Sequence, residues 1–238
     1  MEKETSAFQK GLRDGLPICL GYISVSFAFG MTATQGGMPA WAALVISMTN
    51  MTSAGQVAGA NLILSGGTYL EIAAATLVIN IRYMLMSLSL SQKVDNTMTS
   101  LQRWVLSFGI TDEVFAVSMQ QEGTVTAKYL SGLIFTPYIG WTLGTLLGAT
   151  ATDLLPASVR TALGIAIYGM FIAIIIPPAR KSGSVARVVI IAAALSCLFR
   201  FTPGFSRVSG GWVMILCAVA VSAYGALRYP VQETEEQR

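Results

Sequence analysis

Histidine is absent from this 238-residue chain, and cysteine and charge are scarce. Without histidine there is no histidine metal ligand, no Ser-His catalytic pair and no histidine proton relay. The three cysteines, Cys19, Cys197 and Cys217, each lie in an apolar run and have no metal-binding spacing. We interpret them as small buried hydrophobic residues, and we expect neither a metal nor a cofactor.

Charged residues make up only 11% of the chain, whereas soluble domains carry about 25%. Hydrophobic residues account for 53%, and the mean hydropathy is +0.62. Such a chain cannot cover a water-facing surface with polar groups, so a lipid bilayer is the better solvent for it. The net charge of +3 is too small to indicate nucleic-acid binding.

Eight apolar segments are candidates for membrane helices, because a spanning helix needs about 20 mostly apolar residues. They are residues 16–34, 40–64, 69–91, 104–121, 128–150, 158–177, 186–200 and 211–228. We expect Pro17 to start the first helix and Pro177-Pro178 to end the sixth. The prediction is an all-α polytopic transmembrane bundle of six to eight membrane helices. It forms one integral membrane domain over residues 1–238, with a cytoplasmic segment at 1–15 and a polar tail at 231–238.

Two of these segments are poor spans. The 40–64 segment is rich in polar and small residues, and 104–121 has two adjacent acids at its middle. They either cross the membrane or form broken helices that re-enter it, which is tolerated only inside protein or beside water. Both arrangements put the two termini in the cytoplasm. The re-entrant one fits the positive-inside rule better, because it moves Lys93 and Arg103 to the cytoplasmic side.

The acids of the second weak segment are Asp112 and Glu113. A carboxylate inside a membrane is costly, which indicates a function by default, and without histidine it is the natural proton carrier. Adjacent residues project about 100° apart on a helix, so we do not expect both to face one cavity. The alternative is structural: Thr111 is a helix N-cap, and the acids occupy the first turn. The two interpretations are compatible.

Arg82 lies deep inside the 69–91 segment. Glu71 is on nearly the same helix face but about 16 Å away by helical rise, too far for a direct ion pair. We therefore expect Arg82 to pair with Asp112 or Glu113; the alternative is that its side chain extends to the membrane surface. The same helix carries a polar stripe that we expect to face inward, formed by Thr76, Asn80, Tyr83 and Ser87.

Residues 52–56 read Thr-Ser-Ala-Gly-Gln. Free backbone N–H groups at a helix break can hold a substrate carboxylate, and Gln56 adds a donor and an acceptor. The alternative is a helix-packing seam through Gly55 and Gly59. The candidate substrate-binding residues of this segment and of the following helix are Thr52, Ser53, Gly55, Gln56, Asn80 and Tyr83.

Gly140, Gly144 and Gly148 recur every four residues in the 128–150 segment. This spacing aligns them on one helix face, where the backbone of a second helix can approach closely. We interpret them as a packing surface and not as a functional site.

Several short motifs occur in order along most of the chain. They are Gly11-Leu-Arg-Asp-Gly-Leu-Pro-Ile18, Gly21-Tyr22, Ala54-Gly55-Gln56, Asn80-Ile81-Arg82, Thr111-Asp-Glu-Val-Phe115 and Met170-Phe-Ile-Ala173. Together they resemble the AzlC family. Members resemble the large subunits of bacterial branched-chain amino-acid exporters, which work with a small AzlD-type membrane subunit and are thought to be driven by the proton gradient.

The resemblance implies a multi-pass subunit of a secondary transporter in the bacterial cytoplasmic membrane. Its expected substrates are branched-chain or other apolar amino acids. Members often have an aromatic residue and a histidine where this chain has Ser53 and Tyr83. Because this histidine is missing, we expect proton coupling to depend on Asp112 and Glu113. In this interpretation Arg82 forms a charge pair with these acids that breaks when a proton binds.

Two other functions are compatible with a membrane protein. The first is an uncoupled channel or facilitator for small neutral solutes, which has little need of buried charges. The second is a membrane enzyme, but the chain has no Gly-x-Ser-x-Gly motif and no paired aspartates on facing helices are recognisable. We therefore do not expect an enzyme.

Overall fold

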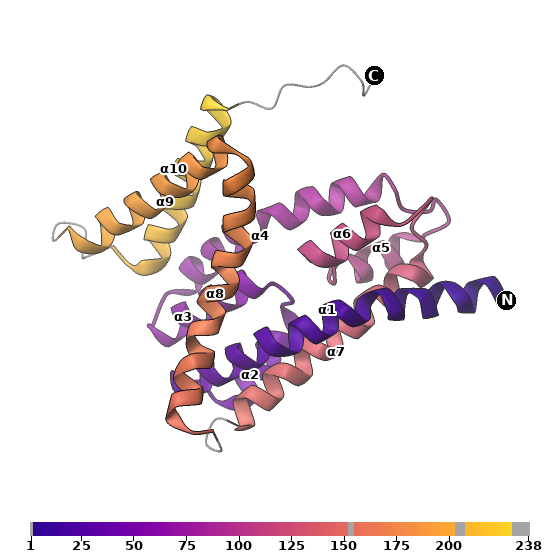
Figure 1. The fold of residues 1–238 in the computed structure, drawn as a ribbon, viewed down its shortest axis with the longest axis horizontal. Coiled ribbons are helices and arrows are strands. Elements are labelled where there is room, and N and C mark those ends of the chain that lie inside the picture. The colour runs from indigo at the N-terminus through magenta and orange to yellow at the C-terminus, as the bar shows by residue number, and fades with distance from the viewer. Residues whose placement is uncertain (1, 152–154, 203–207, 230–238) are drawn as a thin grey trace.

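The computed structural model describes residues 2–151, 155–202 and 208–229, and in these ranges every regular element is an α-helix (Figure 1). The helices are α1 (Glu2–Gln35), α2 (Ala40–Thr49), α3 (Ser53–Leu64), α4 (Tyr69–Ser91), α5 (Ser100–Ser107), α6 (Asp112–Gln120), α7 (Ala127–Ala151), α8 (Ala157–Lys181), α9 (Gly183–Phe201) and α10 (Gly210–Arg228). The all-α prediction is confirmed.

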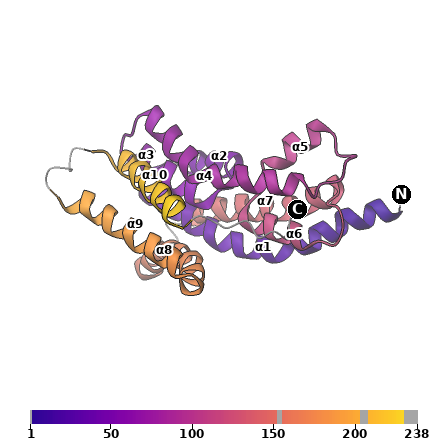
Figure 2. The ribbon, with the colours of Figure 1, turned by 90° about the horizontal axis from the view of Figure 1, so that it is seen from above.

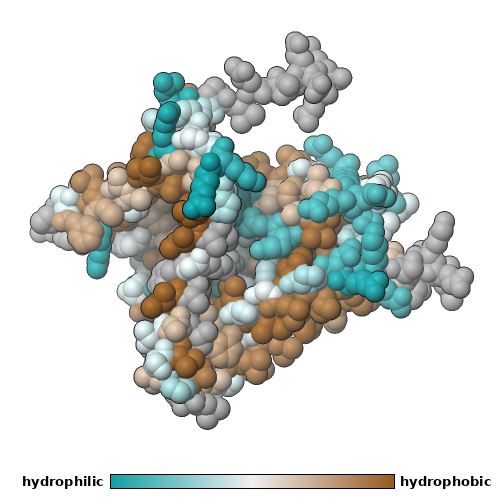
Figure 3. Space-filling view, viewed as in Figure 1, coloured by the Kyte–Doolittle hydropathy of each residue, from teal (hydrophilic) through white to brown (hydrophobic). Residues whose placement is uncertain are grey.

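Within the described residues, five helices are long and apolar enough to cross a membrane: Ala7–Gln35, Tyr69–Ser91, Ala127–Ala151, Gly183–Phe201 and Gly210–Arg228. Large apolar side chains point outward from them, as Leu77 of α4 does with 67% of its surface exposed. Hydrophobic residues cover much of the face seen in Figure 3, and hydrophilic residues gather where the α4–α5 and α6–α7 connections lie. This distribution matches a polytopic helical membrane protein.

The prolines do not mark helix ends, which corrects two expectations. Pro17 lies inside α1, which begins at Glu2, and Pro177 and Pro178 lie inside α8. Proline's fixed φ is compatible with a helix, and its cost is one missing N–H bond and crowding of one carbonyl. The amide of Ser182 still donates to the Pro178 carbonyl at 3.0 Å, so helical hydrogen bonding resumes directly after the pair.

Helices α1 and α7 lie side by side and run parallel (Figure 1). A Cβ atom on Gly140, Gly144 or Gly148 would collide with α1, and the residues met are, in order, Cys19, Ile23 with Ser26, and Phe27. The predicted packing surface on α7 is therefore confirmed. Only glycine lets the two backbones approach this closely.

The first weak segment is a broken helix that turns back. Helices α2 and α3 are separated by residues 50–52, whose turn reaches the middle of α7: the Trp141 indole donates to the Asn50 carbonyl at 3.3 Å. Both outer ends of the pair lie where α1 ends. The Met38 amide, before α2, donates to the Ala33 carbonyl, and a Cβ on Gly36 would lie 2.7 Å from Leu64 at the end of α3.

The second weak segment turns back in the same way from the opposite end. Helices α5 and α6 are separated by residues 108–111, and the end of α6 lies near the start of α1, where Lys10 donates to Gln121 at 2.8 Å. Lys93, just after α4, donates to the carbonyls of Met119 and Gln121 at 2.6 and 2.5 Å. Both segments are thus re-entrant in shape, and Lys93 lies at the same end as the start of α1.

The two halves of this core have inverted directions. A long helix followed by a broken pair occurs first as α1 with α2–α3 and again as α4 with α5–α6. Helix α4 starts where α1 ends and finishes beside the start of α7, so it runs opposite to α1. Many secondary transporters are built from inverted repeats with discontinuous helices that meet at the substrate site.

Helices α8 to α10 complete the described structure, with α8 and α9 on one side of the molecule in Figure 2. The start of α10 is attached to the start of α4 through Glu71, of which 3% is exposed. The Glu71 carboxylate accepts from the Gly211 amide at 2.9 Å and from the Ser209 hydroxyl. Glu71 therefore has its own partners and, as expected, is not the partner of Arg82.

Candidate functional site

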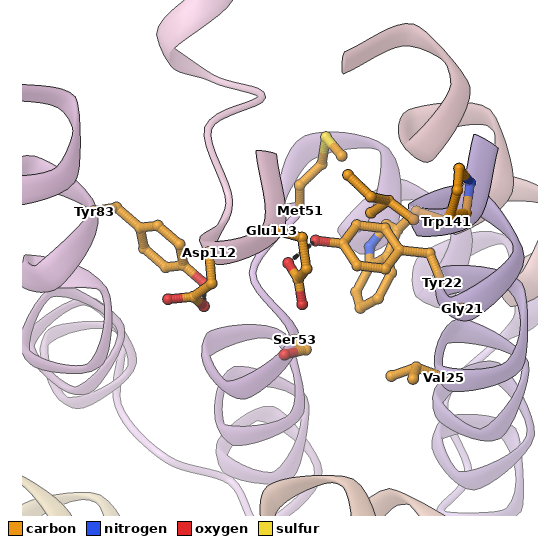
Figure 4. Close-up of a pocket in the computed structure, with 11 residues that line it drawn as sticks. Gly21, Tyr22, Val25, Met51, Ser53, Tyr83, Asp112, Glu113 and Trp141 are labelled. Atoms are coloured by element: carbon orange, nitrogen blue, oxygen red, sulfur yellow. Dashed lines mark hydrogen bonds between the residues drawn. The ribbon is translucent and has the colours of Figure 1, made fainter. Parts of the chain in front are cut away.

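A cavity of about 490 Å³ lies where the two helix breaks meet the middle of α1 and α7 (Figure 4). Its apolar wall comes from Pro17, Ile18, Val25, Met51 and Trp141. Its polar side chains are Tyr22, Ser53, Tyr83, Asp112 and Glu113. The size and the mixture of an apolar wall with a few polar groups are typical of small-molecule sites.

Arg82 forms a two-bond ion pair with Asp112. The Nη2–Oδ2 distance is 2.9 Å and the Nη1–Oδ1 distance is 3.0 Å. The guanidinium also donates to the Tyr83 hydroxyl at 3.1 Å and lies 4.9 Å from the centre of its ring. The predicted pairing of Arg82 with one of the two acids is confirmed, and the paired acid is Asp112. Two parallel bonds fix the orientation of both groups.

Glu113 is held by a different helix. Its Oε2 atom lies 2.5 Å from the Tyr22 hydroxyl of α1, which in turn lies 2.7 Å from the Thr111 hydroxyl. Thr111 accepts from the Val114 amide at 3.4 Å, so it caps α6 as the structural interpretation predicted. Tyr22 is 9% exposed and its ring packs edge-on against Trp141 at 5.1 Å.

Both acids line the same cavity, contrary to our expectation. Helical periodicity separates adjacent side chains only where the side of the helix faces the cavity. Asp112 and Glu113 are instead the first two residues of α6, whose end points at the cavity. Their side chains diverge around that end, Asp112 toward Tyr83 and Glu113 toward Tyr22 (Figure 4).

Of the predicted substrate-binding residues, Ser53 and Tyr83 line the cavity, whereas Thr52, Gly55, Gln56 and Asn80 do not. Gln56 is 1% exposed and lies within the protein, where it donates to Ser47 at 2.7 Å and accepts from Trp141 at 3.0 Å. Ser47 is in turn 2.6 Å from Thr145. This network joins α2, α3 and α7 behind the cavity wall.

Gly55 lies where α3 packs on α4. A Cβ there would come within 2.5 Å of the Thr52 hydroxyl and 2.7 Å of the Asn80 amide nitrogen. The packing alternative for this glycine therefore fits the structure. The Thr52 hydroxyl donates to the Asn50 side chain at 2.6 Å, which stabilises the turn between α2 and α3.

Two helix N-termini face the cavity with different electrostatics. The N-terminus of α6 has the Thr111 cap and the two acids in its first turn. Helix α3, which starts at Ser53, has no acidic residue in its first turn, and Thr52 makes no capping bond. The positive end of the α3 dipole thus lies beside Ser53 without an acidic residue in its own first turn.

Tyr22, Met51 and Trp141 are cavity residues that the sequence argument missed. Tyr22 was a detectable signal, because its phenol group lies in the middle of an apolar helix. Trp141 follows Gly140 on a helix assigned only to packing. Its position at the cavity depends on how α7 is rotated against α1, which no local pattern encodes.

Comparison with known proteins assigns the family. The profile of the family described as AzlC protein matches residues 17–155, which contain every cavity residue. The chain is 27% identical to the inner membrane protein YgaZ of Escherichia coli (strain K12) over 206 residues, 83% of this chain and 84% of YgaZ. It is 31% identical to an uncharacterized membrane protein of Archaeoglobus fulgidus over 176 residues, 73% and 77% of the two chains. No solved structure matches. The chain therefore belongs to the AzlC family of membrane proteins.

Proposed function

We propose that this protein is a subunit of a secondary transporter that exports branched-chain or other apolar amino acids across the bacterial cytoplasmic membrane, coupled to protons. The observation that carries the proposal is the cavity at the meeting point of the two inverted broken-helix pairs. It combines the three features that an apolar amino acid requires: a place for its carboxylate, a place for its ammonium group and an apolar wall.

In this proposal, the carboxylate of the amino-acid substrate binds at the N-terminus of α3. Ser53, the first residue of α3, lines the cavity, and the first turn of α3 has no acidic residue to compete for the free N–H groups of a helix N-terminus. The aliphatic side chain then lies against Ile18, Val25 and Met51. A cavity of about 490 Å³ is large enough for a leucine-sized molecule with some water.

The inverted arrangement supports transport over catalysis. In transporters of this construction, one half moves against the other around a fixed site, which opens alternately to the two sides. The ion pair between Arg82 of α4 and Asp112 of α6 lies at one wall of the site. Protonation of the acids would weaken such charge contacts and so connect proton binding to that movement.

Orientation and assembly are part of the proposal. We propose that both termini lie in the cytoplasm, in line with the positive-inside pattern. We also propose a small AzlD-type membrane subunit as partner, as the family resemblance implies. The apolar helix α9 has no buried residue in the described structure, so its surface is available to such a subunit. Copurification of the two subunits from detergent tests this part.

Transport is tested with the purified protein, alone and with its small subunit, in lipid vesicles carrying an imposed pH gradient. We expect leucine flux that a protonophore abolishes, and we expect the double variant Asp112→Asn with Glu113→Gln to lose the coupled flux. Flux that ignores the protonophore would instead support an uncoupled facilitator. Unchanged coupled flux in the double variant would remove the two acids from the mechanism.

A further inference from the structure

We propose that Glu113 is a cation subsite, at which a primary ammonium group and a proton compete for the same carboxylate. The inference deepens the proposed function, on which its reference to an amino-acid substrate rests. It gives the two adjacent acids different tasks, although their residue type and their position in the sequence do not distinguish them.

The two acids differ in their charge balance. Both oxygens of Asp112 are bonded to the Arg82 guanidinium. Among the described residues, Glu113 has no ion pair, and its recorded hydrogen bond comes from the neutral Tyr22 hydroxyl. The cavity wall thus carries one carboxylate without a cation. Such a carboxylate is available to bind a positively charged ligand that enters the cavity.

The side chains around Glu113 suit an ammonium ligand. Tyr22 and Trp141 both line the cavity, with ring centres 5.1 Å apart. Aromatic rings attract ammonium groups electrostatically, and a nearby carboxylate adds a charge-assisted hydrogen bond. Ser53, at the N-terminus of α3, lines the same cavity. An amino acid can therefore extend its ammonium toward Glu113 and its carboxylate toward α3.

The same carboxylate can also hold a proton without losing its hydrogen bonds. When Glu113 is ionised it only accepts, and the Tyr22 hydroxyl donates to it. When Glu113 is protonated, its O–H can donate to Tyr22, whose hydroxyl then donates to Thr111. The carboxyl group therefore keeps a hydrogen bond to Tyr22 in either state, and an arriving ammonium displaces the proton.

Among the described groups around Glu113, none offers a second unpaired carboxylate for which a proton and an ammonium could compete. The titratable or charged groups that face it are Tyr22 on α1, Arg82 and Tyr83 on α4, and Asp112 on α6 itself. The neighbouring cavity residues of α7 and α3, Trp141 and Ser53, do not titrate near neutral pH. Asp112 is held by Arg82, so an entering cation meets Glu113 as the unpaired carboxylate.

The test separates the ammonium from the rest of the substrate. Binding to the purified, detergent-solubilised protein is measured across a pH series for isopentylamine, which has only the ammonium, for 4-methylpentanoate, which has only the carboxylate, and for leucine. For wild type we expect isopentylamine to bind. As the pH is lowered and protons occupy Glu113, its affinity should fall by up to tenfold per pH unit. For Glu113→Gln we expect at least a tenfold loss of affinity and no pH dependence.

Control variants guard against misfolding and unspecific charge effects. Glu122→Gln makes the same isosteric change at an exposed position of the α6–α7 connection and should bind isopentylamine like wild type. Glu113→Asp keeps the carboxylate on a shorter side chain, so binding should weaken while the pH dependence persists. This variant decides the question if Glu113→Gln does not fold.

The outcomes distinguish this inference from the proposed function. If isopentylamine binds equally well to wild type and Glu113→Gln, with the same pH dependence, the cation subsite is wrong. If leucine binds to both proteins and isopentylamine to neither, the subsite is again wrong while amino-acid transport stands. If isopentylamine binding depends on Glu113 but leucine does not bind, the subsite stands and the proposed substrate is wrong.

Discussion

The indole N–H of Trp141 on α7 donates to the side-chain oxygen of Gln56 on α3 over 3.0 Å. The side-chain amide of Gln56 in turn donates to the Ser47 hydroxyl on α2 at 2.7 Å. One buried side chain therefore holds together the broken pair α2–α3 and the helix behind it. The network supports the cavity wall from outside, because Trp141 lines the cavity and Gln56 does not.

Replacement of Gln56 by leucine should destabilise the protein. Leucine has a similar size but removes both hydrogen bonds of Gln56, while the Trp141 indole retains the Asn50 carbonyl and Ser47 retains Thr145. A lost hydrogen bond of this kind costs about 0.5–1.5 kcal/mol. We expect a lower thermal midpoint in detergent, measured by intrinsic fluorescence. Gln120→Leu, at an exposed position, is the matched control, and an equal midpoint for Gln56→Leu and wild type would contradict the structural role.

The ion pair between Arg82 and Asp112 predicts non-additive effects. Arg82→Gln leaves the Asp112 carboxylate without its cation and should lower both the thermal midpoint and leucine flux. The double variant with Asp112→Asn removes both charges and should regain part of the thermal midpoint. Because each side chain is about 40% exposed, we expect a coupling energy of only about 1 kcal/mol. Additive stability losses in this double-mutant cycle would show that the two residues do not interact.

The close contact of α1 and α7 predicts that Gly144 tolerates no side chain. Even the Cβ of Gly144→Ala would overlap Ser26 and the Ile23 backbone, so the helices must move apart. Overpacking of this kind costs about 1–3 kcal/mol. We expect a reduced yield of monodisperse protein on size-exclusion chromatography. Gly169→Ala is the comparison, because nothing lies within 4 Å of a Cβ there, and equal yields would argue against the contact.

The re-entrant arrangement predicts the sides of two connections. If α2–α3 and α5–α6 both turn back, residue 65 faces the periplasm and residue 97 the cytoplasm; two full crossings would reverse both positions. Ser65→Cys and Thr97→Cys are introduced into a variant whose native cysteines, Cys19, Cys197 and Cys217, are alanine. A membrane-impermeant thiol reagent on intact cells should label position 65 and spare position 97. With the N-terminus in the cytoplasm, the opposite labelling would show that both segments cross.

Local chemistry made much of the site predictable. Arg82 could be assigned an acidic partner because a lone charge in an apolar helix needs one, and the structure supplies Asp112. Thr111 was recognisable as a cap because it precedes two acids at the start of a helix. Gln56 was misplaced because an amide in a polar segment binds a ligand or a neighbouring helix equally well. Which of these it does depends on residues far away in the chain, here Ser47 and Trp141.

The sequence by itself determined that the chain is a helical membrane protein with two segments too polar for ordinary spans, because apolar length and polar content are local properties that water and lipid act on directly. Tertiary structure alone decided that the interruptions enter from opposite ends and meet around Tyr22, and that Asp112 and Glu113 share one cavity with different partners. These features depend on the rotation and direction of packed helices. The rotation and direction of the helices are determined by contacts between residues as distant in sequence as Tyr22 and Glu113. No pattern within one segment contains such contacts.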